Sequence, residues 1–231
     1  VEAGLRSFNR AMPEEINRVL TDHLSTILFC PTEESVKNLQ AENVKTGVYN
    51  VGDIMYDASS FYNDVVNIEE FFPADIRLDT SKKLACMTIH RQENVESEKR
   101  LRKVVEYAKE KAQEFEIIFP THPNTKKKLA EYNIDTAGLV TIPPQSYLAM
   151  QSIMRKCDLV LTDSGGLQKE AYFNGVRTIT IRSETEWVET ISHGWNRLWT
   201  SEDYACDTRP IADYGQGDSA EKICSVLMGD Y

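Results

Sequence analysis

Short apolar runs alternate with segments of strong helix formers along most of the sequence, and this alternation constrains the fold more than any other feature. We predict strands at residues 83–89, 116–120, 138–142, 157–161 and 177–181, and helices at residues 97–114, 124–132, 145–155, 165–173 and 186–192. Strands that alternate with helices favour a parallel sheet. The sequence therefore predicts an α/β fold built on a parallel sheet.

A second, shorter α/β unit precedes this one. Helices are predicted at residues 13–24 and 32–42, and strands at residues 26–30 and 47–51. The segment "NIEEFFPADIRLDTS" interrupts the pattern with Pro73 and polar residues, which is typical of a linker. We therefore expect a first domain at residues 1–66, a second at residues 67–214, and a C-terminal helix within residues 215–231.

Composition argues against several classes of partner. The 231 residues carry a formal net charge of −10, whereas nucleic acids and anionic membranes are bound by basic surfaces. No apolar run approaches the roughly 20 residues of a membrane span. The five cysteines are scattered without a CxxC pair, so neither a disulfide framework nor a zinc site is indicated, and we expect a reducing, cytoplasmic compartment.

The stretch "CDLVLTDSGGLQKEA" marks a place where a buried strand passes directly into a helix. The first N–H groups of a helix lack intrahelical partners, and their partial positive charge attracts anions such as phosphates. A Gly-Gly pair alone would also suit a plain tight turn. However, polar residues follow three other predicted strands as well: His90 and Arg91, then His122, then Arg182. Parallel strands bring these residues to one edge of the sheet, which predicts an anion-binding crevice there.

Six segments in order, "VEAGLRS", "MPEEINR", "TIHRQENV", "THPN", "DSGGLQKEA" and "IRSETEWVE", resemble the signatures of the non-hydrolysing UDP-N-acetylglucosamine 2-epimerases. The resemblance implies a GT-B fold of two Rossmann-like domains with the active site in the cleft. Residues 67–214 would form the C-terminal, UDP-binding domain, and residues 1–66 would be the remnant of the N-terminal domain. The resemblance also implies a UDP-sugar substrate and no cofactor or metal. We expect the protein to form a homodimer.

The family's reaction, as the resemblance implies it, expels UDP by anti elimination to give a glycal and adds UDP back after reprotonation from the other face. Such a site must hold a diphosphate and supply groups for proton transfer. By their match to family motifs, the residues expected in these roles are Glu2, Glu14 and His90 for catalysis; Ser164, Gly165, Gly166 and Arg182 for the diphosphate; Glu170 for the ribose hydroxyls; Arg18 to orient Glu14; and Arg91 and His122 for a second, activating UDP-sugar that some members bind.

Several alternatives stay open on the sequence. Without the resemblance, Glu14 is ordinary first-turn charge at a helix start, Glu2 is a solvated residue near a chain end, and Arg18 is the partner of an i,i+4 ion pair. Many UDP-N-acetylglucosamine epimerases read "TERPE" where this chain has "TEWVE", and enzymes acting on UDP-2,3-diacetamido-2,3-dideoxyglucuronate look more like the latter. A GT-B glycosyltransferase and a non-catalytic UDP-sugar-binding module are the competing functions.

The resemblance also implies that Val1 falls late in the N-terminal domain. We therefore expect residues 1–231 alone to bind UDP weakly and to be inactive as an epimerase. We further expect the first domain, with exposed apolar faces around Ile27, Leu28 and Phe29, either to rest on a partner copy or to be poorly ordered.

Overall fold

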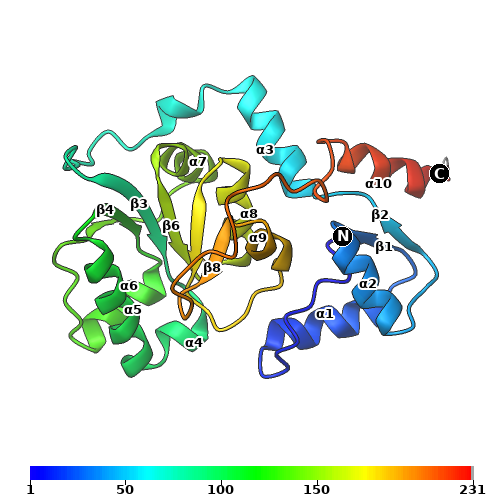
Figure 1. The fold of residues 1–231 in the computed structure, drawn as a ribbon, viewed down its shortest axis with the longest axis horizontal. Coiled ribbons are helices and arrows are strands. Elements are labelled where there is room, and N and C mark those ends of the chain that lie inside the picture. Colours follow the sequence, from blue (N-terminus) through cyan, green and yellow to red (C-terminus); the bar gives the residue numbers. More distant parts are fainter. Residues whose placement is uncertain (230–231) are drawn as a thin grey trace. The chain divides into compact units, whose positions relative to one another are not determined.

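The computed structural model describes residues 1–229, which form two compact units (Figure 1). Of the described residues, the first comprises 1–66, 184–188 and 210–229, and the second comprises 67–183 and 189–209. The short segment 184–188 and the C-terminal segment thus group with residues 1–66, which the sequence pattern did not anticipate. The boundary between residues 66 and 67 falls where the predicted linker begins.

The second unit is built on a six-stranded sheet in the order β5-β4-β3-β6-β7-β8, and every neighbouring pair is parallel. This confirms the predicted parallel sheet. Its strands are β3 (Lys83–Thr88), β4 (Phe115–Pro120), β5 (Val140–Ile142), β6 (Leu159–Thr162), β7 (Arg177–Thr180) and β8 (Asn196–Leu198). Its helices are η1 (Ile68–Phe71), α4 (Gln92–Val95), α5 (Glu98–Lys111), α6 (Pro123–Glu131), α7 (Tyr147–Lys156), α8 (Gly165–Phe173) and α9 (Val188–Ser192), the first residue of α9 belonging to the first unit.

Apolar side chains cover both faces of this sheet. Successive residues of a strand point to opposite faces, so Ala85 and Met87 of β3 join one buried cluster while Cys86 joins another. The first cluster contains the buried face of α5, including Leu101 and Val104. The second contains buried residues of α7 and α8. Burial of each large aliphatic side chain contributes about 1.5–3 kcal/mol to the stability of the folded state. The two layers therefore stabilise the sheet that carries the loops at its edge.

The first unit contains a small parallel pair, β1 (Leu28–Cys30) and β2 (Val48–Asn50), connected through α2 (Glu33–Ala41). The side chain of Thr32 caps α2 by accepting a hydrogen bond from the N–H of Ser35. Ile27 is exposed as expected, at 39%, but the expectation is wrong for Leu28 and Phe29, which are only 1% and 5% exposed. Leu28 packs with Ala3 and Leu39. The unit's other helices are α1 (Pro13–Leu24), α3 (Ile54–Val65) and α10 (Ser219–Met228).

The sequence pattern did not predict η1, which lies in the expected linker, nor α3, α4 and β8. Helix α3 begins after Asp53, whose side chain accepts from the N–H of Met55, but its Tyr, Phe, Ser and Asn residues are weak helix formers. Helix α4 has only four residues, and β8 has three with no apolar run. Such elements form because tertiary neighbours stabilise them, β8 by pairing with β7 and α3 by packing on α10.

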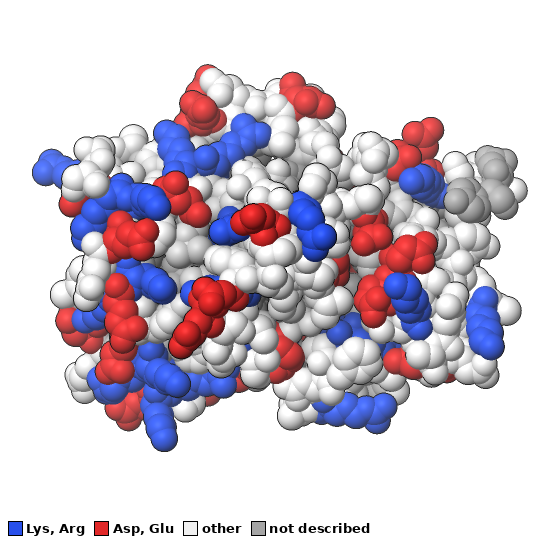
Figure 2. Space-filling view, in the orientation of Figure 1, with Lys and Arg blue, Asp and Glu red and all other residues white. Residues whose placement is uncertain are grey.

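The charged surface is mixed. On the face shown in Figure 2, Lys and Arg side chains are interspersed with Asp and Glu side chains and do not gather into a basic stripe. No helix among the described residues combines the length and the apolar character needed to cross a membrane.

Candidate active site

The carboxyl ends of β4, β3, β6 and β7 lie side by side, because these strands are neighbours in the parallel sheet. The loops that follow them carry His122, His90, Ser164 and Arg182 respectively. Three of these four residues meet in one cavity of about 220 Å³. Its lining is Thr88, Ile89, His90, Pro120, His122, Pro144, Gln145, Met150, Ser164 and Leu167. The sheet thus brings His90, His122 and Ser164 to one cavity at its edge, among apolar residues such as Ile89, Met150 and Leu167.

Asp163 is the centre of a hydrogen-bond network at this edge, although the sequence did not single it out. The residue is 0% exposed. Its carboxylate accepts from the backbone N–H of His90 at 3.1 Å, from that of Arg91 at 2.9 Å, and from Nδ2 of Asn94 at 2.9 Å. Nδ1 of the His90 ring lies 3.2 Å from Oδ1. One buried carboxylate therefore fixes the whole loop that follows β3.

Two opposing effects act on the pKa of Asp163. Burial raises it, since a desolvated carboxylate is less favourable than a neutral acid. Hydrogen bonds and charge attraction from His90, with those from Asn94 and the Arg91 backbone, outweigh burial, and the net result is a pKa below the ordinary value. Asp163 is therefore an ionised acceptor in the folded protein.

Helix α8 starts at the same place. Ser164 is its N-cap, with extended backbone angles and a side chain that accepts from the N–H of Leu167 at 3.4 Å. Gly165 and Gly166 are the first two helical residues. Their N–H groups belong to the first turn, which has no intrahelical acceptors, so the helix presents donors and positive dipole to an anion. The side chain of Arg91 is anchored close by, because its Nε donates to the carbonyl of Asp163 at 2.9 Å.

Glu170 lies one and a half turns further along α8. Its Oε2 accepts from Nε2 of Gln151 on α7 at 3.1 Å. Burial raises its pKa to about 7 against the opposing effects of Lys169 and Gln151, so the group can exist as an acid or a carboxylate near neutral pH. Arg182, beyond the end of β7, is 0% exposed and places a fixed positive charge inside the same unit.

His122 is exposed and caps α6. Its Nδ1 accepts from the backbone N–H of Asn124 at 3.3 Å, and Pro123 occupies the first helical position, where its missing N–H costs nothing. Both histidines of the cavity are therefore oriented by hydrogen bonds at Nδ1.

In the first unit, Glu2 is exposed and lies in a left-handed turn with φ of 57°. The turn is held by buried polar groups. The N–H of Gly4 donates to Oδ2 of Asp22 at 2.9 Å, and the buried Arg6 bonds to Asp22 at 2.7 Å and to Glu42 at 2.6 Å. The hydrogen bonds from Arg6 outweigh burial and lower the pKa of Glu42 to about 2. This ion-pair network fixes the backbone beside Glu2.

Glu14 and Glu15 are adjacent but have different surroundings. Glu14 is exposed in the first turn of α1, whereas Glu15 is buried and accepts from the N–H groups of Ser7 and Phe8, both at 2.9 Å. Arg18 was expected to orient Glu14, but it pairs instead with Glu15 at 3.3 Å and with Glu186 at 2.9 Å. Glu186 belongs to the segment 184–188 of the same unit, so this pair ties the "TEWVE" motif to α1.

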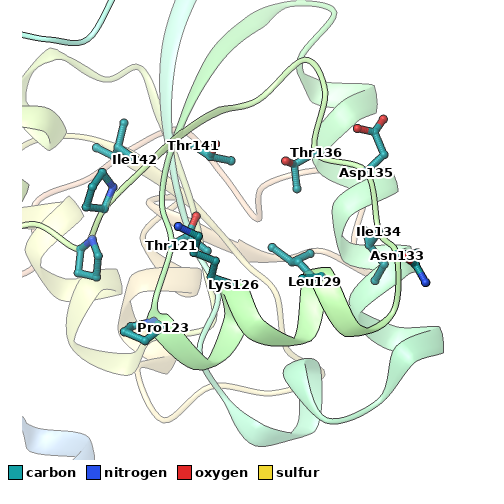
Figure 3. A pocket seen from close by; sticks show the side chains of 13 residues that line it. Thr121, Pro123, Lys126, Leu129, Asn133, Ile134, Asp135, Thr136, Thr141 and Ile142 are labelled. Atoms are coloured by element: carbon teal, nitrogen blue, oxygen red, sulfur yellow. The ribbon is translucent and has the colours of Figure 1, made fainter.

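A larger cavity of about 740 Å³ lies along α6 and β5 (Figure 3), and Pro144 lines both this cavity and the small one. Lys126 and Leu129 of α6 line one side, and Thr141 and Ile142 line the other. None of the residues predicted for the site lines it, so its size does not mark it as the reactive centre. Among residues 1–229, no group of three or more His, Cys, Asp or Glu side chains could hold a metal ion.

Comparison with known proteins gives the family. A profile described as UDP-N-acetylglucosamine 2-epimerase matches residues 1–228. The chain belongs to this family. A UDP-N-acetylglucosamine 2-epimerase homolog from Methanococcus maripaludis is 41% identical, and the match covers 98% of this chain and 67% of the relative. A UDP-2,3-diacetamido-2,3-dideoxy-D-glucuronate 2-epimerase from Pseudomonas aeruginosa is 40% identical over 98% of this chain and 66% of its own length. The chain thus spans about two thirds of these relatives.

Solved structures agree. The Methanocaldococcus jannaschii UDP-GlcNAc 2-epimerase in complex with UDP-GlcNAc and UDP superposes with a TM-score of 0.87 at 35% identity, covering 99% of this chain and 68% of that one. The Neisseria meningitidis UDP-GlcNAc 2-epimerase bound to UDP-GlcNAc gives a TM-score of 0.82 at 29% identity, covering 99% and 69%. These matches confirm the predicted family and the GT-B-type fold class, with a Rossmann-like domain and part of a second one.

Proposed function

We propose that the protein inverts carbon 2 of a UDP-N-acetylhexosamine. The observation that carries this proposal is the meeting of the α8 start with His90, held on Asp163, in one cavity of about 220 Å³. The helix start suits a diphosphate, and the histidine beside it suits proton transfer. Membership of the epimerase family supports the same reaction.

In this proposal the second unit binds the nucleotide. Ser164, Gly165 and Gly166 receive the diphosphate, and the charge of buried Arg182 favours the anion. Glu170 hydrogen-bonds to the ribose hydroxyls, a role that suits a carboxyl group with a pKa of about 7. Arg18 contributes to substrate binding, supported by its fixed position between Glu15 and Glu186.

The chemical steps are an elimination and its reversal. A base removes the proton from carbon 2, the C–H electron pair forms the C1–C2 double bond, and the C1–O bond breaks with its electrons remaining on UDP. Return of a proton to the opposite face of carbon 2 and re-addition of UDP to C1 give the epimer. We assign the proton transfers to Glu2, Glu14 and His90. The networks of Arg6 and Glu15 support the two carboxylates, since they fix the backbone on which Glu2 and Glu14 lie.

Two substrates remain candidates. The Methanococcus maripaludis homolog is named for the UDP-N-acetylglucosamine reaction and the Pseudomonas aeruginosa relative for the diacetamido-glucuronate reaction, and their identities to this chain are 41% and 40%. We further propose a homodimer, a cytoplasmic location, and a second UDP-sugar contact through Arg91 and His122. The five free cysteines support the reducing compartment.

The test is incubation of the protein, made from its complete reading frame, with each UDP-sugar in heavy water. We expect deuterium at carbon 2 and a second epimer with one of the two substrates. Glu14→Gln keeps the shape of the side chain but cannot carry a proton, so it should reduce exchange by about 10²-fold or more with UDP affinity nearly unchanged.

Other outcomes would identify another function. Transfer of the sugar to an added acceptor without deuterium incorporation would identify a glycosyltransferase. Binding of UDP by calorimetry without any change in the sugar would identify a binding module. Either result would overturn the proposed epimerisation.

A further inference from the structure

The two histidines that line the small cavity are hydrogen-bonded through the same ring nitrogen, but to partners of opposite character. Nδ1 of His90 lies 3.2 Å from the carboxylate oxygen Oδ1 of Asp163. Nδ1 of His122 lies 3.3 Å from the backbone nitrogen of Asn124. Both rings line the cavity together with Ser164 and Gln145.

Each partner dictates where the ring proton sits. An ionised carboxylate can only accept, so Nδ1 of His90 must carry the hydrogen, and a neutral ring then has a bare Nε2. A backbone N–H can only donate, so Nδ1 of His122 must be bare, and a neutral ring then carries its hydrogen on Nε2. The cavity thus contains one imidazole with an Nε2 acceptor and one with an Nε2–H donor.

We propose that Asp163 is a positioning residue that holds His90 in the Nδ1–H tautomer and so presents Nε2 as a proton acceptor at the sheet edge. Asp163 is suited to this because it is 0% exposed and cannot rotate away. Three further donors hold its two oxygens: the backbone N–H groups of His90 and Arg91 and the side-chain amide of Asn94. Its lowered pKa keeps it ionised, which a pure acceptor requires.

The use of this acceptor rests on the proposed function, whereas the tautomer itself does not. When Nε2 takes a proton, the ring becomes an imidazolium with one N–H on each side. The Nδ1–H bond to Asp163 is kept, Asp163 remains a carboxylate, and its charge stabilises the new cation. The cation then lies in the cavity that Ser164 also lines, close to where a diphosphate leaving group gains negative charge. Asp163 would thereby link proton acceptance to departure of UDP through one buried side chain.

The experiment is a ¹H–¹⁵N spectrum of the imidazole rings of the labelled protein at a pH of about 8, where an ordinary histidine is neutral. We expect His90 as the Nδ1–H tautomer and His122 as the Nε2–H tautomer. In Asp163→Asn, the signals of His90 should move to the Nε2–H form or to a mixture, while those of His122 should not change. His122 is therefore a reference inside the same molecule.

Asn94→Ala is the matched control for a merely structural role. Asn94 is also 0% exposed, and it bonds to Oδ2 of Asp163, to the carbonyl of Ile181 and to Arg100, but it does not contact the His90 ring. Its replacement should destabilise the loop and leave the His90 tautomer unchanged. A kinetic assay uses the UDP-sugar that takes up deuterium at carbon 2. With this substrate, Asp163→Asn should lower kcat by about 10²-fold or more and change KM by less than about threefold.

The results separate this proposal from the proposed function. An Nε2–H tautomer of His90 in the unaltered protein would overturn the role of Asp163, even if Asp163→Asn failed to fold. So would an equal shift of His90 in Asn94→Ala and Asp163→Asn. Absence of deuterium exchange in the unaltered protein would instead overturn the epimerase assignment, and the tautomer would still be decided by the spectrum.

Discussion

In the second unit the parallel sheet positions the candidate residues, whereas in the first unit ion pairs between buried side chains position them. His90, His122 and Ser164 follow buried parallel strands, and a single carboxylate, Asp163, fixes the loop that carries His90. Glu2 lies instead on a left-handed turn beside a two-stranded sheet, and the ion pairs of Arg6 hold that turn.

The difference shows what each kind of scaffold requires. A six-stranded sheet with both faces covered can lose one surface contact and keep its edge in place. The short segment with positive φ at Glu2, Gly4 and Phe8 has strained backbone, and buried polar contacts such as those of Arg6 hold it in place. We therefore expect substitutions in the polar network of the first unit to cost more than substitutions at the sheet edge.

The largest effect is expected for Arg6→Ala. The substitution leaves the buried Asp22 and the half-buried Glu42 without their cation, which should lower the free energy of unfolding by about 3–5 kcal/mol. Urea unfolding measures this. Arg102→Ala is the control, because the Arg102–Glu98 pair is 41% and 56% exposed and should contribute less than about 1 kcal/mol. Equal losses in the two variants would show that the network does not hold the first unit.

Gly4→Ala should come next, at roughly 2–4 kcal/mol, from the left-handed backbone and from steric overlap. Gly4 has φ of 78°, and an added Cβ would lie 2.2 Å from the carbonyl oxygen of Ser35. Gly138→Ala separates the two causes, because Gly138 has φ of 87° but nothing within 4 Å of an added Cβ. The difference between the variants in thermal unfolding isolates the overlap, and a negligible difference would contradict it.

Glu170→Gln should change the pH dependence of stability. The folded pKa of about 7 lies above the ordinary 4.5, so the folded state binds more protons between these values and loses stability as pH rises through them. Glutamine does not titrate. The variant should therefore gain on the order of 2 kcal/mol over the unaltered protein at pH 8, and the two should agree near pH 4.5. A constant difference across this range would show that burial does not act on Glu170.

The smallest effect is expected for Gly166→Val at the start of α8. A branched side chain there should hinder close approach of a diphosphate to the first-turn N–H groups and weaken UDP binding about tenfold, or 1.4 kcal/mol. Calorimetric titration with UDP measures this, and an unchanged circular dichroism spectrum shows that the fold is kept. Unaltered affinity would show that the α8 start does not bind the diphosphate.

Much of the second unit could be predicted from the sequence, because short apolar runs and helix-forming segments are local signals. The predicted helix at residues 165–173 has the observed bounds, and the strand predicted at 83–89 is found at 83–88. The edge that gathers His90, His122 and Ser164 followed from the parallel topology alone. The helix α3 and the strand β8 could not be predicted, since their stability comes from distant neighbours.

The residues that orient the candidate site could not be predicted from the sequence either. Asp163 reads as an ordinary polar residue after a strand, and its role depends on contacts with His90, 73 residues away. Arg6 and Glu15 are charged residues that one expects at the surface, yet they are 3% and 2% exposed. The one available signal was their place inside motifs that resemble the family, "VEAGLRS" and "MPEEINR".

The distance along the chain between His90 and Asp163 also sets the order of events during synthesis. Strand β3 pairs with β6, so the His90 loop gains its carboxylate only after 73 more residues have been added. At about 5–20 residues per second, the ribosome needs roughly 4–15 s to make that stretch. During this interval a growing chain gains β4 and β5 beside β3, but it still lacks β6 and the start of α8. Under the proposed function, a nucleotide therefore cannot assist early folding, and it stabilises only chains in which β6 has already paired.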